Sequence, residues 1–211
     1  MEVENKSAKI ADYLLQIKAI KLNTNNPYTW ASGWKSPIYC DNRISLSYPE
    51  IRNFIKLSLA EEIKRNYPEA EAIVGVATAG IAQAALVADF LKLPCAYVRP
   101  EPKSHGRQNQ LEGDLVEGTK VVVLEDLIST GKSSLLAAEV LRNLGLNVLG
   151  MAAIFTYGFE LAEENFKAHN CAYFALSNYE VLLQEALKKG YIKKDELVLL
   201  SEWRKNPATW Q

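Results

Sequence analysis

The sequence has few cysteines, no excess of charge of one sign and no long hydrophobic run. Its three cysteines, Cys40, Cys95 and Cys171, lie far apart and form no Cys-x-x-Cys pair, so neither a disulfide framework nor a zinc site is indicated. No apolar run approaches the ~20 residues that a membrane-spanning helix needs. Residues 1–9 are polar and include two glutamates, so we expect no secretion signal, no membrane attachment and a cytoplasmic protein.

The charges of the chain are balanced. Lysine and arginine total 24 against 25 aspartates and glutamates, which gives a formal net charge of -1. The whole molecule therefore offers no electrostatic case for binding nucleic acid or an anionic membrane. Any anion site must be local, built from a few side chains and backbone dipoles. With 211 residues, 48% of them hydrophobic, the chain can close one sizeable core, and we expect a single domain over 1–211.

Apolar segments of strand length alternate with segments of helical periodicity. Strands are expected at 72–77, 95–98, 121–124 and 148–155, and helices at 7–20, 51–67, 81–91, 133–144, 160–168 and 179–188. Residues 23–43 are rich in turn residues and aromatics and predict loops and short strands, while the charged C-terminal end is expected to be peripheral. Strands that are apolar on both faces predict an α/β fold, with a mainly parallel sheet flanked by helices on both sides.

The most informative stretch follows the apolar run 121–124. Two carboxylates, Glu125 and Asp126, precede the segment 129–134, whose sequence is Ser-Thr-Gly-Lys-Ser-Ser. The strand delivers this segment to the carboxyl edge of the sheet, where open α/β folds bind ligands. Unpaired N–H groups at the start of the following helix can hold a phosphate, and Gly131 allows close approach. A ribose 5-phosphate suits both parts, with its hydroxyls toward the acids and its phosphate toward the loop.

Three other interpretations apply to a stretch of this kind. A Walker A loop requires glycine where this chain has Asp126, so that motif is excluded. No Gly-x-Gly-x-x-Gly follows any expected strand, so a Rossmann fingerprint is absent as well. An acidic turn with a helix cap and no ligand stays open on this stretch alone.

The stretch resembles the donor-binding motif of type I phosphoribosyltransferases: an apolar strand, two acids, two apolar residues and a Ser/Thr-Thr-Gly-x-Ser/Thr loop. The segment 32–43 is similar to the Ser-Gly-x-x-Ser-Pro-x-Tyr-x-Asp-x-Arg stretch of orotate phosphoribosyltransferases, and 99–113 to their mobile catalytic loop. The resemblance implies the type I fold with a small N-terminal hood over 20–45. It also implies transfer of a phosphoribosyl group to orotate in pyrimidine biosynthesis, and a homodimer that shares loop 99–113 across subunits.

The resemblance further implies a role for each matched residue. The catalytic residues would be Lys103, His105 and Asp126, with His105 a candidate proton donor to the leaving pyrophosphate. Binding of the donor, 5-phosphoribosyl 1-pyrophosphate, would involve Thr78, Ala79, Gly80, Arg99, Lys103, His105, Glu125, Asp126, Leu127, Ile128, Ser129, Thr130, Gly131, Lys132 and Ser133. Binding of orotate would involve Lys35, Tyr39, Cys40, Arg43 and Ser129. The cofactor would be Mg²⁺, held through the pyrophosphate and ribose of the donor, with no assigned protein ligand.

The chain departs from the family pattern at several positions. Ala31 and Pro100 stand where some members carry lysine, and no arginine follows the strand expected at 148–155. The partner of the orotate carboxylate therefore stays open between Lys35 and Arg43. Two alternative functions also stay open: a phosphoribosyltransferase that acts on a purine base, and a non-catalytic regulator that binds the same donor. A regulator usually adds a nucleic-acid-binding segment, and the sequence shows no basic stripe.

Overall fold

The computed structural model describes residues 5–30, 32–99 and 110–210. Contacts divide the chain into two compact units, one formed by 1–51 with 177–211 and the other by 52–176. Within the described ranges, no helix combines the length and the hydropathy required to cross a bilayer.

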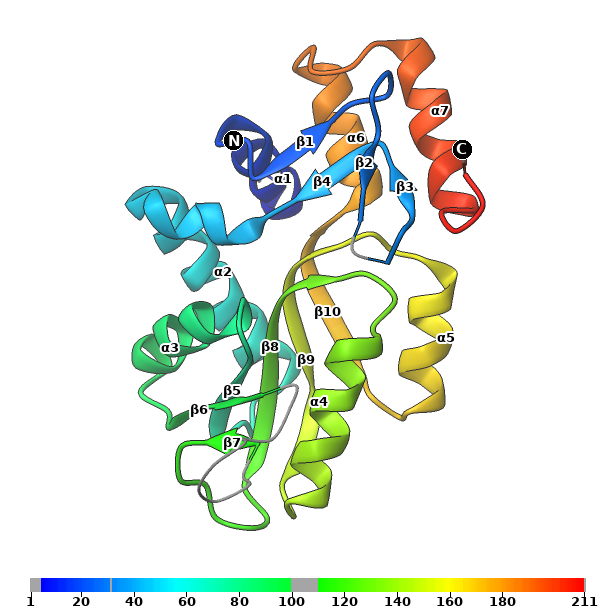
Figure 1. Cartoon of the computed structure of the whole chain (residues 1–211). Helices are drawn as coiled ribbons and strands as arrows, with labels where there is room; N and C mark the ends of the chain where they lie inside the picture. Colours follow the sequence, from blue (N-terminus) through cyan, green and yellow to red (C-terminus); the bar gives the residue numbers. More distant parts are fainter. Residues whose placement is uncertain (1–4, 31, 100–109, 211) are drawn as a thin grey trace. The chain divides into compact units, whose positions relative to one another are not determined.

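A six-stranded sheet forms the centre of the unit 52–176 and runs in the order β10-β9-β8-β5-β6-β7 (Figure 1). The strands are β5 (Ala72–Val76), β6 (Cys95–Val98), β7 (Leu111–Glu112), β8 (Lys120–Ile128), β9 (Asn147–Thr156) and β10 (Tyr173–Asn178). The pairs β5–β6, β5–β8 and β8–β9 are parallel, whereas β7 is antiparallel to β6. Four adjacent strands therefore end at the same edge.

Helices cover both faces of this sheet. The helices are α2 (Pro49–Asn66), α3 (Gly80–Leu91), α4 (Lys132–Asn143) and α5 (Glu160–Ala168). On one face, Val74 and Val123 share a buried cluster with Leu135 of α4 and Phe166 of α5. On the other face, Gly75 faces α3 so closely that a Cβ there would lie 2.9 Å from the Ala84 Cβ. Alternate residues of each strand thus face different helices, which confirms the predicted α/β sheet.

The central strand extends further than the sequence predicts. The strand is expected to end at Leu124, but β8 continues to Ile128 and includes both acids. The extension follows from pairing with β9, in which Glu125 lies opposite Ala153 and Ile128 opposite Thr156. Ladder pairing with a neighbouring strand outweighs the polarity of two residues, so the predicted end of the strand at Leu124 is wrong.

The predicted mobile segment 99–113 begins and ends in the sheet. The Arg99 N–H donates to the Gln110 carbonyl at 2.8 Å, and β7 pairs with β6 through Leu111 and Glu112. These residues extend the sheet edge instead of belonging to an irregular loop. Residues 100–109 lie outside the described part of the chain.

The unit formed by 1–51 and 177–211 contains helices and short strands (Figure 1). They are α1 (Lys6–Gln16), β1 (Ile20–Leu22), β2 (Tyr28–Thr29), β3 (Lys35–Ser36), β4 (Ile38–Cys40), a 3-10 helix η1 (Asn42–Ser47), α6 (Tyr179–Lys188) and α7 (Lys194–Lys205). Helix α1 packs against α6, and the pairs β1–β4 and β2–β3 are antiparallel. The described residues of 23–43 form short strands and turns, as expected, and η1 begins at Asn42. The helix expected over 7–20 ends at Gln16, and Ile20 already belongs to β1.

The C-terminal helix is not peripheral. Leu200 and Trp203 of α7 are both 0% exposed, and the Tyr179 hydroxyl of α6 donates to the Leu200 carbonyl at 3.0 Å. The charges of this segment lie at positions that leave one apolar stripe at helical spacing, and this stripe is buried. The expectation based on the charged composition is therefore wrong.

Candidate active site

Two chain segments meet at the carboxyl edge of the sheet because β5 and β8 are parallel neighbours. The turn 77–79 connects β5 to α3, and the peptide between Ala77 and Thr78 is cis. Helix α3 begins at Gly80, where a Cβ would lie 2.3 Å from the Leu124 carbonyl oxygen of β8. Only glycine permits this approach. The turn with Thr78, Ala79 and Gly80 therefore lies beside the acids of β8.

The two acids differ in environment. Glu125 is 7% exposed and accepts hydrogen bonds from the Ser134 hydroxyl at 3.5 Å and the Asp126 N–H at 3.2 Å. Burial, together with the nearby charge of Asp126, raises the pKa of Glu125 to about 8. Asp126 is half-buried. Near pH 7 the folded protein therefore holds a proton on this pair, which leaves one acid as a hydrogen-bond donor and the other as an acceptor.

The segment after β8 leads into the start of helix α4, where an anion could bind. Gly131 is the N-cap of α4 and has a φ of +79°, and a Cβ there would lie 2.6 Å from the Phe166 ring. Lys132 and Ser133 follow in the first turn with exposed side chains. The first N–H groups of a helix have no partner within it, and its dipole favours a negative charge at this end. The stretch 129–133 thus offers a phosphate site.

Helix α5 supports this loop, a role that the sequence did not reveal. The Asn165 side-chain amide donates to the Thr130 carbonyl at 2.9 Å, and Phe166 lies against Gly131. Asn165 stands 35 positions from Thr130 in a helix that shows only an amphipathic pattern. No local signal could have indicated this contact.

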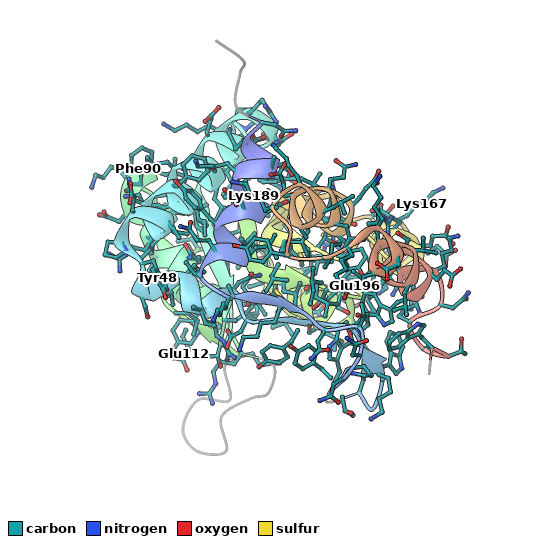
Figure 2. All side chains as sticks on the ribbon, turned by 90° about the horizontal axis from the view of Figure 1, so that it is seen from above. Tyr48, Phe90, Glu112, Lys167, Lys189 and Glu196 are labelled. Carbon is teal, nitrogen blue, oxygen red and sulfur yellow. The ribbon has the colours of Figure 1, made fainter. Side chains whose placement is uncertain are left out.

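Arg99 reaches the same edge from the neighbouring strand. It follows β6, which lies next to β5, and the Ala77 N–H donates to the Val98 carbonyl at 2.8 Å. The Arg99 guanidinium lies 3.5 Å from the carboxylate of Glu112, which Figure 2 labels on β7. The backbone of Arg99 therefore follows a strand end that is bonded to Ala77, and its guanidinium is paired with Glu112. Lys103 and His105 lie outside the described residues.

The remaining candidates belong to the unit of 1–51 and 177–211. The Tyr39 ring is 40% exposed and lies 5.5 Å from the Tyr28 ring. The Cys40 thiol donates to the Asn42 side-chain oxygen at 3.3 Å. An exposed ring and a polar rim are suited to contact with a planar base.

The two candidate cations for a carboxylate differ in their partners. The Lys35 ammonium donates to the Thr29 hydroxyl at 2.9 Å. The Arg43 guanidinium makes two contacts with Asp41, at 2.6 Å and 3.0 Å, and this pairing lowers the pKa of Asp41. The charge of Arg43 is thus matched by a carboxylate, whereas the recorded partner of Lys35 is neutral.

The described residues contain no group of three or more His, Cys, Asp or Glu that could hold a metal ion. Two adjacent carboxylates are present, at Glu125 and Asp126. Mg²⁺ keeps several waters and is usually held by one or two carboxylates together with substrate phosphates. The residues fit an ion that is carried largely by a phosphorylated substrate.

An acid pair on a central parallel strand, followed directly by a phosphate-binding helix start, is the arrangement that a phosphoribosyl donor requires. Residues 50–187 match the family model described as the phosphoribosyl transferase domain.

Comparison with known proteins narrows this class. The orotate phosphoribosyltransferase of Porphyromonas gingivalis is 57% identical over 95% of this chain and 96% of the relative, and that of Listeria innocua is 52% identical over 96% and 97%. The crystal structure of orotate phosphoribosyltransferase from Aeropyrum pernix superposes with a TM-score of 0.75 at 30% identity, covering 87% of this chain and 99% of that one. The chain belongs to the orotate phosphoribosyltransferase family, which confirms the resemblance found in the sequence.

Proposed function

We propose that this protein transfers the 5-phosphoribosyl group from 5-phosphoribosyl 1-pyrophosphate to orotate and releases pyrophosphate and orotidine 5′-monophosphate. The observation that carries this proposal is the position of Glu125 and Asp126 on β8, directly before the helix start at 129–133. The relatives, named as orotate phosphoribosyltransferases and matched over nearly their full length, support orotate as the acceptor.

The donor is bound in three parts. Asp126 accepts hydrogen bonds from the ribose hydroxyls, and the protonated Glu125 beside it donates one. Ser129, Thr130, Gly131, Lys132 and Ser133 hold the 5-phosphate, while Leu127 and Ile128 connect the two sites along β8. The backbone N–H groups of Thr78, Ala79 and Gly80 hold the pyrophosphate, with Arg99 near them.

The reaction calls for positive charge beside the leaving group. A ring nitrogen of orotate loses its proton and bonds to C1 of the ribose while the bond from C1 to the pyrophosphate oxygen breaks. Positive charge develops on the sugar and negative charge on the leaving group, so fixed cations favour the transition state. Lys103 and His105 supply such charge, and His105 provides a proton to the pyrophosphate. Mg²⁺ carried by the donor would supply further positive charge there.

The acceptor base is held by residues of β3, β4 and the segment after them. The Lys35 ammonium donates to the neutral Thr29 hydroxyl, whereas the Arg43 guanidinium is paired with the Asp41 carboxylate. Lys35 is therefore the better cation to bind the orotate carboxylate. Tyr39, Cys40 and Ser129 complete the base site. Arg43 then serves to hold the turn at Asp41.

We propose further that the protein is a homodimer in which loop 99–113 of one subunit completes the site of the other. Mixing two inactive variants tests this arrangement. In a mixed dimer of Lys103→Ala and Asp126→Asn, one site would receive an intact loop and an intact acid. Recovery of activity on mixing supports the shared loop, whereas two variants that stay inactive as a mixed dimer place Lys103 in its own subunit's site.

An assay with different acceptor bases tests the proposed reaction. Purified protein, the donor and Mg²⁺ are incubated with orotate, adenine or xanthine, and pyrophosphate release is measured. We expect pyrophosphate release in the incubation with orotate and none in the incubations with adenine or xanthine. Release with adenine or xanthine and none with orotate would favour the purine enzyme. Donor binding by calorimetry without turnover of any base would favour the regulator.

A further inference from the structure

Helix α7 contacts the β2–β3 hairpin of its own unit at two points. The Trp203 indole N–H donates to the Lys35 carbonyl of β3 at 3.2 Å. Seven positions earlier on the same helix, the carboxylate of Glu196, labelled in Figure 2, accepts a hydrogen bond from the Thr24 hydroxyl at 2.7 Å. Thr24 precedes β2 and Lys35 lies in β3, so α7 is bonded both to the chain before the hairpin and to the second strand of the hairpin.

The contact at Trp203 is buried and aromatic. Trp203 is 0% exposed; its ring packs edge-on against Trp30 with the ring centres 5.6 Å apart, and in a tilted arrangement against Tyr179 of α6 at 5.4 Å. Trp30 in turn donates its indole N–H to the Ile38 carbonyl at 3.1 Å. Aromatic side chains have few rotatable bonds and fill large volumes. When they pack together, they fix the chain segments that carry them relative to one another. The hairpin is therefore fixed to α6 and α7 by packing as well as by hydrogen bonds.

Glu196 is itself held in place. Its second carboxylate oxygen accepts from the Lys193 N–H at 2.9 Å, which completes a capping box at the start of α7. The bonds from Lys193 and Thr24 lower the pKa of Glu196. One carboxylate thus links the beginning of α7 to the chain before β2.

We propose that α7 positions the base-binding segment, and that Trp203 is a positioning residue for orotate. This inference rests on the proposed function, in which Lys35 binds the orotate carboxylate. The indole N–H holds the backbone of Lys35 in place. The position of this backbone determines where the Lys35 ammonium can lie and therefore whether it can contact the orotate carboxylate. A side chain that is already held in the binding position loses little conformational entropy when the ligand binds. The protein then binds the ligand more tightly, because ordering that side chain on binding would cost free energy.

The variant Trp203→Phe tests this role because it keeps an aromatic ring and removes the N–H donor. We expect KM for orotate to rise about fivefold, the change that loss of one ordinary hydrogen bond produces. KM for the donor and kcat are expected to change by less than about twofold, since the donor site lies on other elements. Trp210→Phe is the matched control, because Trp210 donates its backbone N–H to the Asn206 carbonyl and the substitution keeps this hydrogen bond.

A second readout does not depend on activity. Amide hydrogen exchange of the ligand-free protein is expected to accelerate in Trp203→Phe at the N–H groups of Trp30 and Gly33, which close the hairpin turn. Should Trp203→Phe fail to fold, Thr24→Val removes the second contact and is expected to show the same selective rise in KM.

Two results would overturn the proposal. One is an unchanged KM for orotate together with unchanged hairpin exchange. The other is a parallel loss of all kinetic parameters with the folded fraction, which indicates a purely structural tryptophan. A wild-type protein that does not turn over orotate would instead refute the proposed function, and the exchange measurement would still show whether α7 holds the hairpin.

Discussion

Replacing Glu125 with glutamine is expected to stabilise the protein, and increasingly so as the pH rises. Burial raises the pKa of this carboxyl from 4.5 to about 8, so folding takes up a proton between these pH values. The unfolded chain binds fewer protons in this window, and stability therefore falls as the pH rises through it. The stability associated with the protonated form is fully present below the unfolded pKa and is lost above about pH 8.

The magnitude follows from the size of the window. One pH unit corresponds to about 1.4 kcal/mol, so the buried carboxyl costs about 2 kcal/mol at pH 6 and up to about 5 kcal/mol above pH 8. Glutamine has nearly the same shape, stays neutral and can still accept the hydrogen bond from Ser134. Its advantage over glutamate should therefore grow with pH. For a chain of this length, each kcal/mol shifts Tm by about 2–4 °C.

The assay is thermal unfolding of both proteins without ligands, followed by circular dichroism from pH 5 to pH 9. We expect Glu125→Gln to melt a few degrees above the wild type at pH 6 and about 10 °C or more above it at pH 9. Glu164→Gln on the exposed side of α5 is the control for removing a carboxylate without burial. A gap in Tm that stays constant with pH, or that reverses at high pH, would refute the assigned environment of Glu125.

Three further predictions concern the substrate sites. Gly80→Ala drives a Cβ into the Leu124 carbonyl, so we expect a loss of about 1–3 kcal/mol in denaturant unfolding and a higher KM for the donor; unchanged values would contradict the close contact. Asn165→Ala leaves the Thr130 carbonyl without its donor, and initial rates should show KM for the donor raised about fivefold with KM for orotate unchanged. Lys35→Ala should raise KM for orotate about tenfold or more, and a larger effect of Arg43→Ala would reverse the assignment of the carboxylate partner.

Local pattern predicted much of the sheet and its helices. The strand at 95–98 and the helices at 160–168 and 179–188 have the predicted bounds, since their apolar spacing is uninterrupted. The acid pair and the phosphate loop also lie in one continuous segment, so their proximity follows from the chain itself.

The errors arise where distant residues decide the structure. β8 extends through Glu125 because β9 offers a partner strand, and polarity alone cannot reveal this. The charged end buries Trp203 because the carbonyl of Lys35, 168 positions away, accepts its N–H. The support of Thr130 by Asn165 is equally non-local. The side chains that hold a site in position can lie far from it in the sequence. The residues next to them in the sequence therefore give no indication of the contact.

The most direct measurement is a crystal structure with orotate, Mg²⁺ and a non-reactive analogue of the donor bound. The account predicts the 5-phosphate against the backbone of 129–133 and the ribose hydroxyls within hydrogen-bond reach of Glu125 and Asp126. A donor analogue bound elsewhere on the sheet, with both carboxylates in contact only with solvent, would contradict it.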